Sequence, residues 1–129
     1  MAKNEYRKWL KRAESNLLLA KSGHIKGVVY EDLCFEAQQS AEKALKALLI
    51  YFGDRFPKIH SFAILLGRLQ KYTDIPDDIK VVLKLSAYAI QTRYPGEYYP
   101  VQKDEYQRAI TIAHDVLIWV KKVIKEEGK

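Results

Sequence analysis

Residues 28–52, VVYEDLCFEAQQSAEKALKALLIYF, carry the strongest structural signal in the chain. Apolar side chains recur in this stretch at intervals of three and four residues, which predicts one long helix with a single buried face. The three alanines on that face would let another helix approach closely. Gly53 and Pro57 then end the helix. The predicted buried positions are Leu33, Ala37, Ala41, Ala44, Leu45, Leu48 and Phe52.

The segments on either side predict two more long helices. The first covers residues 4–21 and ends at Ser22-Gly23, since glycine is a common helix stop. The last covers residues 104–126, where Asp104 and Gln107 have the spacing of a capping box. One apolar row runs along the first helix: Tyr6, Leu10, Ala13, Leu17 and Ala20. Two apolar rows run along the last helix. The first row is Tyr106, Ile110, Ala113, Leu117, Val120 and Ile124, and the second is Ala109, Ile112, Val116, Trp119 and Val123.

Two shorter helices are predicted between the long ones. One covers residues 61–71, with Ser61 as its N-cap. The other begins near Asp74 and Pro76, where Asp74 offers a cap and Pro76 fixes the first turn. It is expected to stop before Pro95-Gly96. Its expected apolar stripe is Ile79, Val82, Leu83, Ser86, Ala87 and Ile90.

These segments together predict an all-α protein, a four- to five-helix up-and-down bundle in a single domain spanning residues 1–129. No alternating strand pattern or internal repeat is visible. Because the last helix is apolar around much of its circumference, we expect the outer helices to carry a homodimer contact.

Composition sets limits on function. The chain has 48% hydrophobic and 29% charged residues, as a globular protein does, and no apolar run near the length of about 20 residues that spans a bilayer. We therefore expect a cytoplasmic protein without a membrane segment. The net charge of +6 permits attraction to nucleic acid or to an acidic protein, but a solvated helix face is the favoured explanation for it. The single cysteine, Cys34, excludes an internal disulfide and is expected to be a buried apolar residue.

Several common chemistries find no support in the motifs. The six glycines are scattered, so neither a P-loop nor a dinucleotide fingerprint is present. His24, His60 and His114 lie in different segments without metal-ligand spacing. We therefore expect no metal and no other cofactor. Asp77-Asp78 falls at a helix start, where acidic side chains complement the helix dipole.

One string within the long central helix resembles a known family. Residues 36–43, Glu-Ala-Gln-Gln-Ser-Ala-Glu-Lys, resemble the central helix of HEPN proteins. Trp9-Leu10, Ile59-His60-Ser61 and Thr92-Arg93-Tyr94-Pro95 extend the resemblance over nearly the whole chain. The resemblance implies a helical bundle, commonly homodimeric and often encoded beside a minimal nucleotidyltransferase that acts as its antitoxin. Active members are metal-independent RNases whose arginine and histidine, separated by four to six residues, form a cleft between two subunits.

Arg108 and His114 satisfy this spacing in the corresponding part of the chain, with five residues between them. In that role the arginine would stabilise phosphate charge and the histidine would move the proton. On one continuous helix, however, six positions place them about 120° apart. Ala109 and Val116 also stand where active members often carry a polar residue and, in some, a tyrosine. The alternative is an ordinary surface arginine and a histidine beside the apolar row.

Arg93, Tyr94 and Tyr98 form a second candidate site. An arginine beside aromatic rings at a helix end combines a phosphate partner with stacking surfaces for RNA or a nucleotide. The alternative is structural: Arg93 pairs with a carboxylate such as Glu36 or Glu42, and the tyrosines pack the loop.

The favoured function from the sequence is a HEPN-type helical module, the partner of a nucleotidyltransferase in a toxin-antitoxin-like pair. One alternative is a metal-independent RNase toxin that uses Arg108 and His114 across a dimer cleft. A passive nucleotide-binding subunit is the other.

Overall fold

A computed structural model of the chain describes residues 2–55, 58, 61–87 and 100–129. Within these ranges all regular structure is helical, which confirms the predicted all-α class. The elements are α1 (Ala2–Ala20), α2 (Tyr30–Tyr51), α3 (Phe62–Leu69), α4 (Asp77–Lys80), the 3₁₀ helix η1 (Val81–Ala87) and α6 (Lys103–Glu127).

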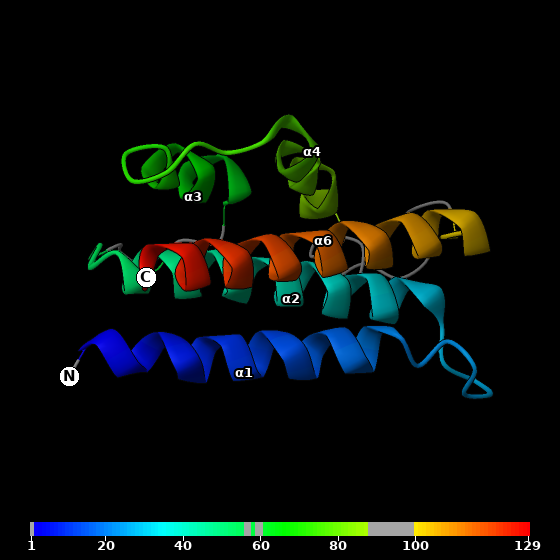
Figure 1. The fold of residues 1–129 in the computed structure, drawn as a ribbon. Coiled ribbons are helices and arrows are strands. Elements are labelled where there is room, and N and C mark those ends of the chain that lie inside the picture. The colour runs from blue at the N-terminus through cyan, green and yellow to red at the C-terminus, as the bar shows by residue number, and fades with distance from the viewer. Residues whose placement is uncertain (1, 56–57, 59–60, 88–99) are drawn as a thin grey trace.

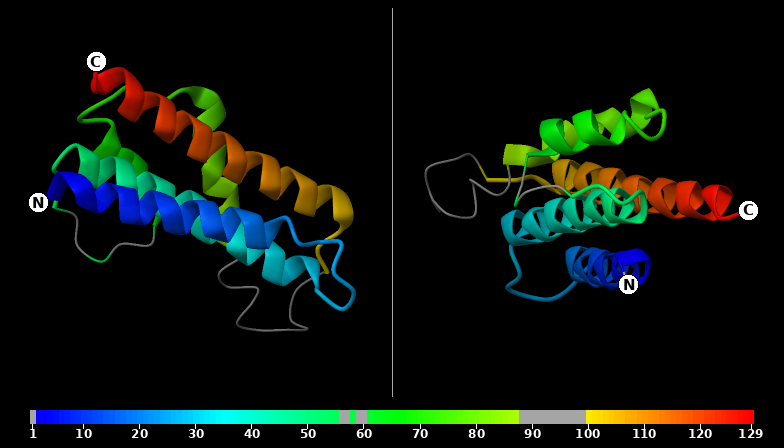
Figure 2. Two further views of the ribbon diagram at one scale, coloured as in Figure 1. Left: turned by 60° about the horizontal axis from the view of Figure 1, so that its bottom comes forward. Right: turned by 90° about the vertical axis from the view of Figure 1, so that its left-hand side faces the viewer.

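The helices form three layers, with α2 and α6 in the middle (Figure 1). Helix α1 covers one side of this pair, and α3, α4 and η1 cover the other side, as the two further views also show (Figure 2). The chain ends lie near the same end of the bundle, since α1 and α6 run in opposite directions. This arrangement leaves α2 between two layers and makes it the most enclosed helix.

The core follows the predicted apolar rows. Ala13, Ala20, Ala37, Ala41 and Ala44 are fully buried, as the close approach of α1 to α2 requires. Both rows of α6 also find cover within the chain, through side chains that include Val116, Leu117 and Val120. Cys34 is buried, as predicted. Buried side chains from the three layers belong to one hydrophobic cluster.

The prediction for the fourth helix was wrong in its form. Instead of one α-helix, four α-helical residues are followed by a 3₁₀ helix over Val81–Ala87. Because a 3₁₀ helix has three residues per turn, Ile79, Val82 and Leu85 align and become buried, while Leu83 is 46% exposed. The predicted end before Pro95 lies outside the described residues.

Helix caps were predicted with mixed success. The Ile64 backbone N–H donates to Ser61 Oγ over 3.3 Å, which confirms Ser61 as the N-cap of α3. Asp74 is not a cap, because α4 begins after Pro76 without a side-chain cap. The capping box was also wrong: α6 begins after Gln102 without a side-chain cap.

A charged contact holds α3 to the end of α2. Asp54 accepts hydrogen bonds from Arg68 Nε and Nη2, over 2.9 and 2.7 Å, and from the Tyr72 hydroxyl over 2.7 Å. Burial by itself would raise the pKa of Asp54, but the hydrogen bonds from Tyr72 and Arg68 outweigh it and lower the pKa. The hydrogen bond between Tyr72 and Asp54 in turn raises the pKa of Tyr72. Asp54 therefore stabilises this corner as a carboxylate.

No helix in the described part of the chain is both long and apolar enough to cross a membrane.

Candidate functional site

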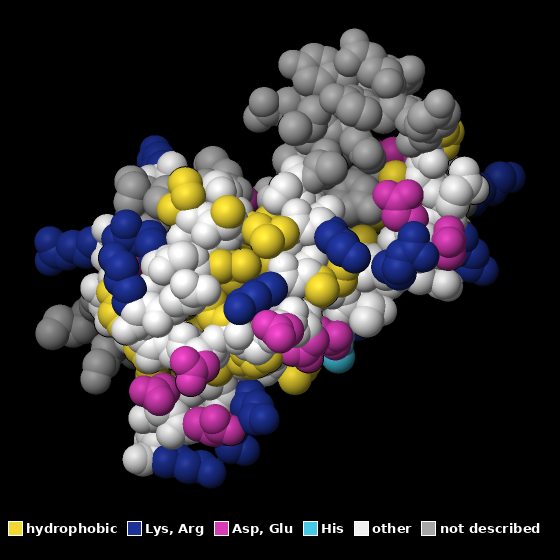
Figure 3. Space-filling model, turned by 90° about the horizontal axis from the view of Figure 1, so that it is seen from above, with side chains coloured by type: hydrophobic (Ala, Val, Ile, Leu, Met, Phe, Trp, Pro, Cys, Tyr) yellow, Lys and Arg dark blue, Asp and Glu magenta, His cyan; other side chains and the backbone are white. Residues whose placement is uncertain are grey.

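A groove of about 780 Å³ lies between η1 and the first half of α6. Its walls combine apolar side chains, such as Leu85 and Ile112, with charged ones. Viewed from the side of α3 and η1, hydrophobic side chains form a band across this face, bordered by charges of both signs (Figure 3). The groove is lined by Val81, Lys84, Leu85, Asp104, Glu105, Gln107, Arg108, Ala109, Thr111 and Ile112.

Arg108 belongs to the wall of this groove. Its Nη1 lies 3.3 Å from Asp104 Oδ2, one helical turn away, and both side chains are largely exposed. The hydrogen bond from Arg108 is the main cause that lowers the pKa of Asp104. Since water screens an exposed pair of this kind and leaves it with little net stabilisation, the guanidinium is free to exchange Asp104 for another anion.

His114 lies on the neighbouring polar edge of α6 and does not line the groove. Its Nδ1 is 3.3 Å from Asp115 Oδ1, and both side chains are about half exposed. When Nδ1 carries the proton, it donates to Asp115 and leaves Nε2 as an acceptor. An unprotonated ring nitrogen is what a general base requires.

The two side chains do not converge within one chain. Helix α6 continues unbroken from Lys103 to Glu127, so the expected angle of about 120° between Arg108 and His114 stands. Six residues also separate them by about 9 Å along the helix axis. A single chain therefore offers an arginine and a histidine on adjacent edges of one helix.

The second candidate site, Arg93, Tyr94 and Tyr98, lies outside the described residues. The same is true of His60. The proposed contact between Glu42 and Arg93 therefore stays a prediction, although the surroundings of Glu42 on α2 are described.

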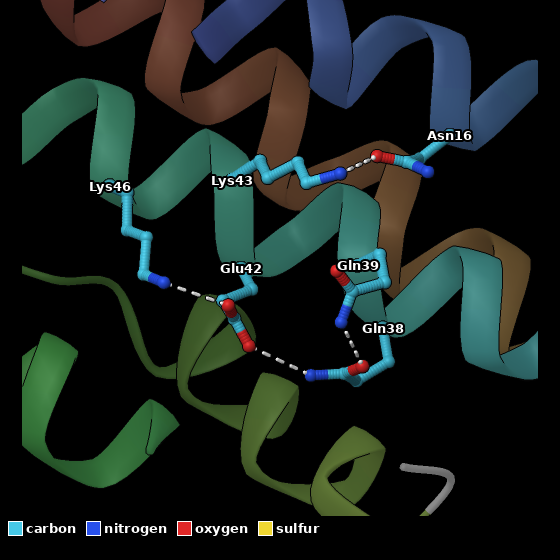
Figure 4. A network of polar contacts seen from close by, with 6 residues as sticks. All are labelled: Asn16, Gln38, Gln39, Glu42, Lys43 and Lys46. Carbon is cyan, nitrogen blue, oxygen red and sulfur yellow. Dashed lines mark hydrogen bonds and ion pairs between the residues drawn. The ribbon is translucent and has the colours of Figure 1, made fainter. Parts of the chain in front are cut away.

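Those surroundings are a buried polar network on the α2 face toward α3 and η1 (Figure 4). Glu42 accepts from Lys46 Nζ over 2.9 Å and from Gln38 Nε2 over 3.0 Å. Gln38 Oε1 in turn accepts from Gln39 Nε2 over 2.9 Å. Gln38, Glu42 and Lys46 are each less than 5% exposed, so two polar residues of the family-like string belong to an internal network with Lys46.

The groove itself was not predicted from the sequence. Lys84 and Leu85 face α6 because of the 3₁₀ geometry of η1, which the apolar spacing did not reveal. A three-residue period at Ile79, Val82 and Leu85 was the available signal. Within the described ranges, no three His, Cys, Asp or Glu side chains gather where they could hold a metal ion.

The fold and this surface define a class: a helical bundle whose last helix carries an arginine and a histidine on adjacent edges. A family model described as HEPN domain matches residues 6–123, and the chain belongs to this family.

Two solved structures are similar over almost their whole length. One is a protein from Thermus thermophilus, with 33% identity, a TM-score of 0.81, and coverage of 92% of this chain and 98% of that one. The other is an archaeal HEPN homologue, with 33% identity, a TM-score of 0.73, and coverage of 92% and 97%. Comparison with curated proteins gives no match.

Proposed function

We propose that the chain is a helical interaction module that pairs with a nucleotidyltransferase protein in a toxin-antitoxin-like pair. The observation that carries this proposal is the groove between η1 and α6, with exposed apolar side chains beside it. Val81 lines the groove and is 37% exposed, Leu83 of the same helix is 46% exposed, and charged side chains also line the groove. An apolar centre with a charged rim is the usual composition of a protein-binding surface.

A complex-formation assay tests this proposal, with the minimal nucleotidyltransferase encoded nearest to the gene as the probe. We expect wild-type protein to form a complex in calorimetry, and Val81→Lys to weaken it at least about tenfold by placing a charge in the apolar wall of the groove. Leu18→Lys is the matched control, since Leu18 is 70% exposed on α1, in the opposite layer. Equal binding by the Val81 variant, or no complex with wild type, contradicts the proposal.

A metal-independent RNase is the second candidate. It is favoured by the weakly held guanidinium of Arg108 and by the contact between His114 and Asp115, which orients the imidazole. Because these groups lie on adjacent edges of α6, this function needs a homodimer in which Arg108 of one copy approaches His114 of the other.

Cleavage of a mixed RNA pool in the presence of a chelator separates the two functions. The RNase function predicts cleavage by wild type and its loss in a folded His114→Ala variant. His24→Ala is the matched control, since His24 is an exposed histidine in the connector after α1. No cleavage by well-folded wild type removes this candidate and leaves the interaction module.

A further inference from the structure

A second surface depression lies on the other side of the bundle. It has a volume of about 350 Å³ and is lined by Lys8, Trp9 and Arg12 of α1 together with Lys43 of α2. Helix α1 and η1 cover opposite sides of the α2 and α6 pair, so this depression is separate from the groove at Arg108 (Figure 1). Neither of the functions proposed above uses it.

The depression carries positive charge that is only partly compensated. Lys8 and Arg12 are exposed, lie one helical turn apart on α1, and make no ion pair among the described residues. Partial burial and the positive charge of Arg12 lower the pKa of Lys43, and the carboxylates of Glu36 and Glu42 offset only part of this effect. Three cations that repel one another favour an anion between them.

The nearest hydrogen-bonding groups hold Lys43 in place. Lys43 Nζ donates to Asn16 Oδ1 over 2.8 Å, and Asn16 Nδ2 donates to Glu36 Oε1 over 2.7 Å. Lys43 therefore points toward Asn16 of α1, while Lys46 donates to the buried carboxylate of Glu42 (Figure 4). The α2 lysines thus have different roles, and Lys43 alone reaches the depression.

Trp9 supplies the one aromatic wall. Its ring is half-buried, and Lys46 Nζ lies 5.6 Å from the ring centroid, within the range of a cation–π contact that fixes the ring from the interior. A rigid indole beside three cations suits a ligand with both a phosphate and a flat base. An acidic peptide would need only the charges, and a membrane surface would need several exposed apolar side chains.

We propose that this depression binds single-stranded nucleic acid, with Lys8, Arg12 and Lys43 contacting phosphates and Trp9 contacting a base. The site does not depend on a nucleotidyltransferase partner or on cleavage by Arg108 and His114. It also gives a role to part of the net positive charge of the chain.

Binding of a fluorescently labelled, 2′-O-methylated single-stranded RNA tests the charges, because this probe resists 2′-hydroxyl-dependent cleavage. For single strands the slope of log K against log salt changes by about 0.7 per phosphate contact, so Lys8→Gln with Arg12→Gln should reduce it by about 1.4. The matched control is Lys122→Gln with Lys125→Gln, which removes equal charge from exposed positions of α6. An equal loss in both double variants overturns the proposal, because binding then follows net charge alone.

Fluorescence tests the aromatic contact. In a Trp119→Phe protein, Trp9 is the only tryptophan, and the RNA should quench its emission at the concentrations at which it binds. Absence of quenching overturns the stacking role. Polyglutamate should displace the RNA poorly, and displacement as effective as by unlabelled RNA assigns the surface to an acidic protein and overturns the nucleic-acid proposal.

Discussion

Replacing Lys46 with methionine should destabilise the protein far more than the loss of a typical lysine. Lys46 and Glu42 form a buried ion pair of 2.9 Å, with side chains only 5% and 4% exposed. Removing one member of such a pair costs about 3–5 kcal/mol, because the remaining buried charge loses a charged partner that water does not replace. Gln38 still donates to Glu42 in the variant, so we expect the lower end, about 3 kcal/mol.

Thermal unfolding measures this cost. With an unfolding entropy of about 2.1 cal/mol/K per residue, a chain of 129 residues loses about 11 °C of Tm for a destabilisation of about 3 kcal/mol. Circular dichroism with urea titration gives the free energy of unfolding independently. The same change at exposed Lys122 is the matched control, with an expected effect within about 0.5 kcal/mol.

A double variant tests the physical reason. Adding Glu42→Gln to Lys46→Met removes the buried charge while an amide oxygen remains to accept from Gln38. We expect the double variant to recover about 2 kcal/mol relative to Lys46→Met. A cost below about 1 kcal/mol for Lys46→Met, or a double variant no more stable than the single one, would refute the reasoning.

Two further variants probe the contacts that hold the layers together. Asp54→Asn should cost about 2 kcal/mol at neutral pH, because hydrogen bonds to a carboxylate from Arg68 and Tyr72 become weaker. Because the pKa of Asp54 is lowered in the folded state, its carboxylate stabilises the fold above about pH 5, and this stabilisation is lost as the pH falls below about 4. The free energies of unfolding of wild type and variant should therefore converge in acid. Tyr106→Phe should cost about 1–3 kcal/mol in urea titration, because the buried Tyr106 hydroxyl donates to the Ala20 carbonyl; an unchanged unfolding midpoint would show that water replaces this hydrogen bond.

The three long helices were predictable because each carries several turns of apolar periodicity. Their ends lie within two residues of the predicted ranges 4–21, 28–52 and 104–126. Such helices obtain their stability from a buried face, and the spacing of apolar residues in the sequence identifies that face.

The region after Pro76 was harder to predict because two periods compete there. Ile79, Val82 and Leu85 fit a period of three, while Leu83 and Ala87 suggested an α-helical stripe. Packing against α6 favours the 3₁₀ form, in which Leu83 is exposed instead of buried. Tertiary contacts decide between the two forms, and the local sequence does not contain those contacts.

The sequence predicted the spacing of the two candidate catalytic residues, but it did not predict the groove beside them. The separation of Arg108 and His114 and their angular offset follow from the sequence and from helix geometry. Their neighbours Asp104 and Asp115 lie nearby in sequence, but contact between them depends on side-chain conformations. The groove needs Lys84 and Leu85 from another element and therefore required the fold.

Helix geometry makes one more prediction about the RNase function. Thr111 lies midway between Arg108 and His114 both along the axis and around it, and its exposed side chain borders the groove. In a two-fold contact between antiparallel α6 helices, each Arg108 meets the other copy's His114 only if the axis passes near Thr111.

Thr111→Arg should therefore abolish dimer formation and RNA cleavage together, because it brings two positive charges face to face at the axis. Thr111→Ser is the matched control, since it keeps the hydroxyl that donates to the Gln107 carbonyl over 3.0 Å. Analytical ultracentrifugation and the chelator-treated cleavage assay measure the two effects. Cleavage that persists in a monomeric Thr111→Arg protein would show that the active geometry forms without a second α6, which is incompatible with the offset of about 120° on an unbroken helix.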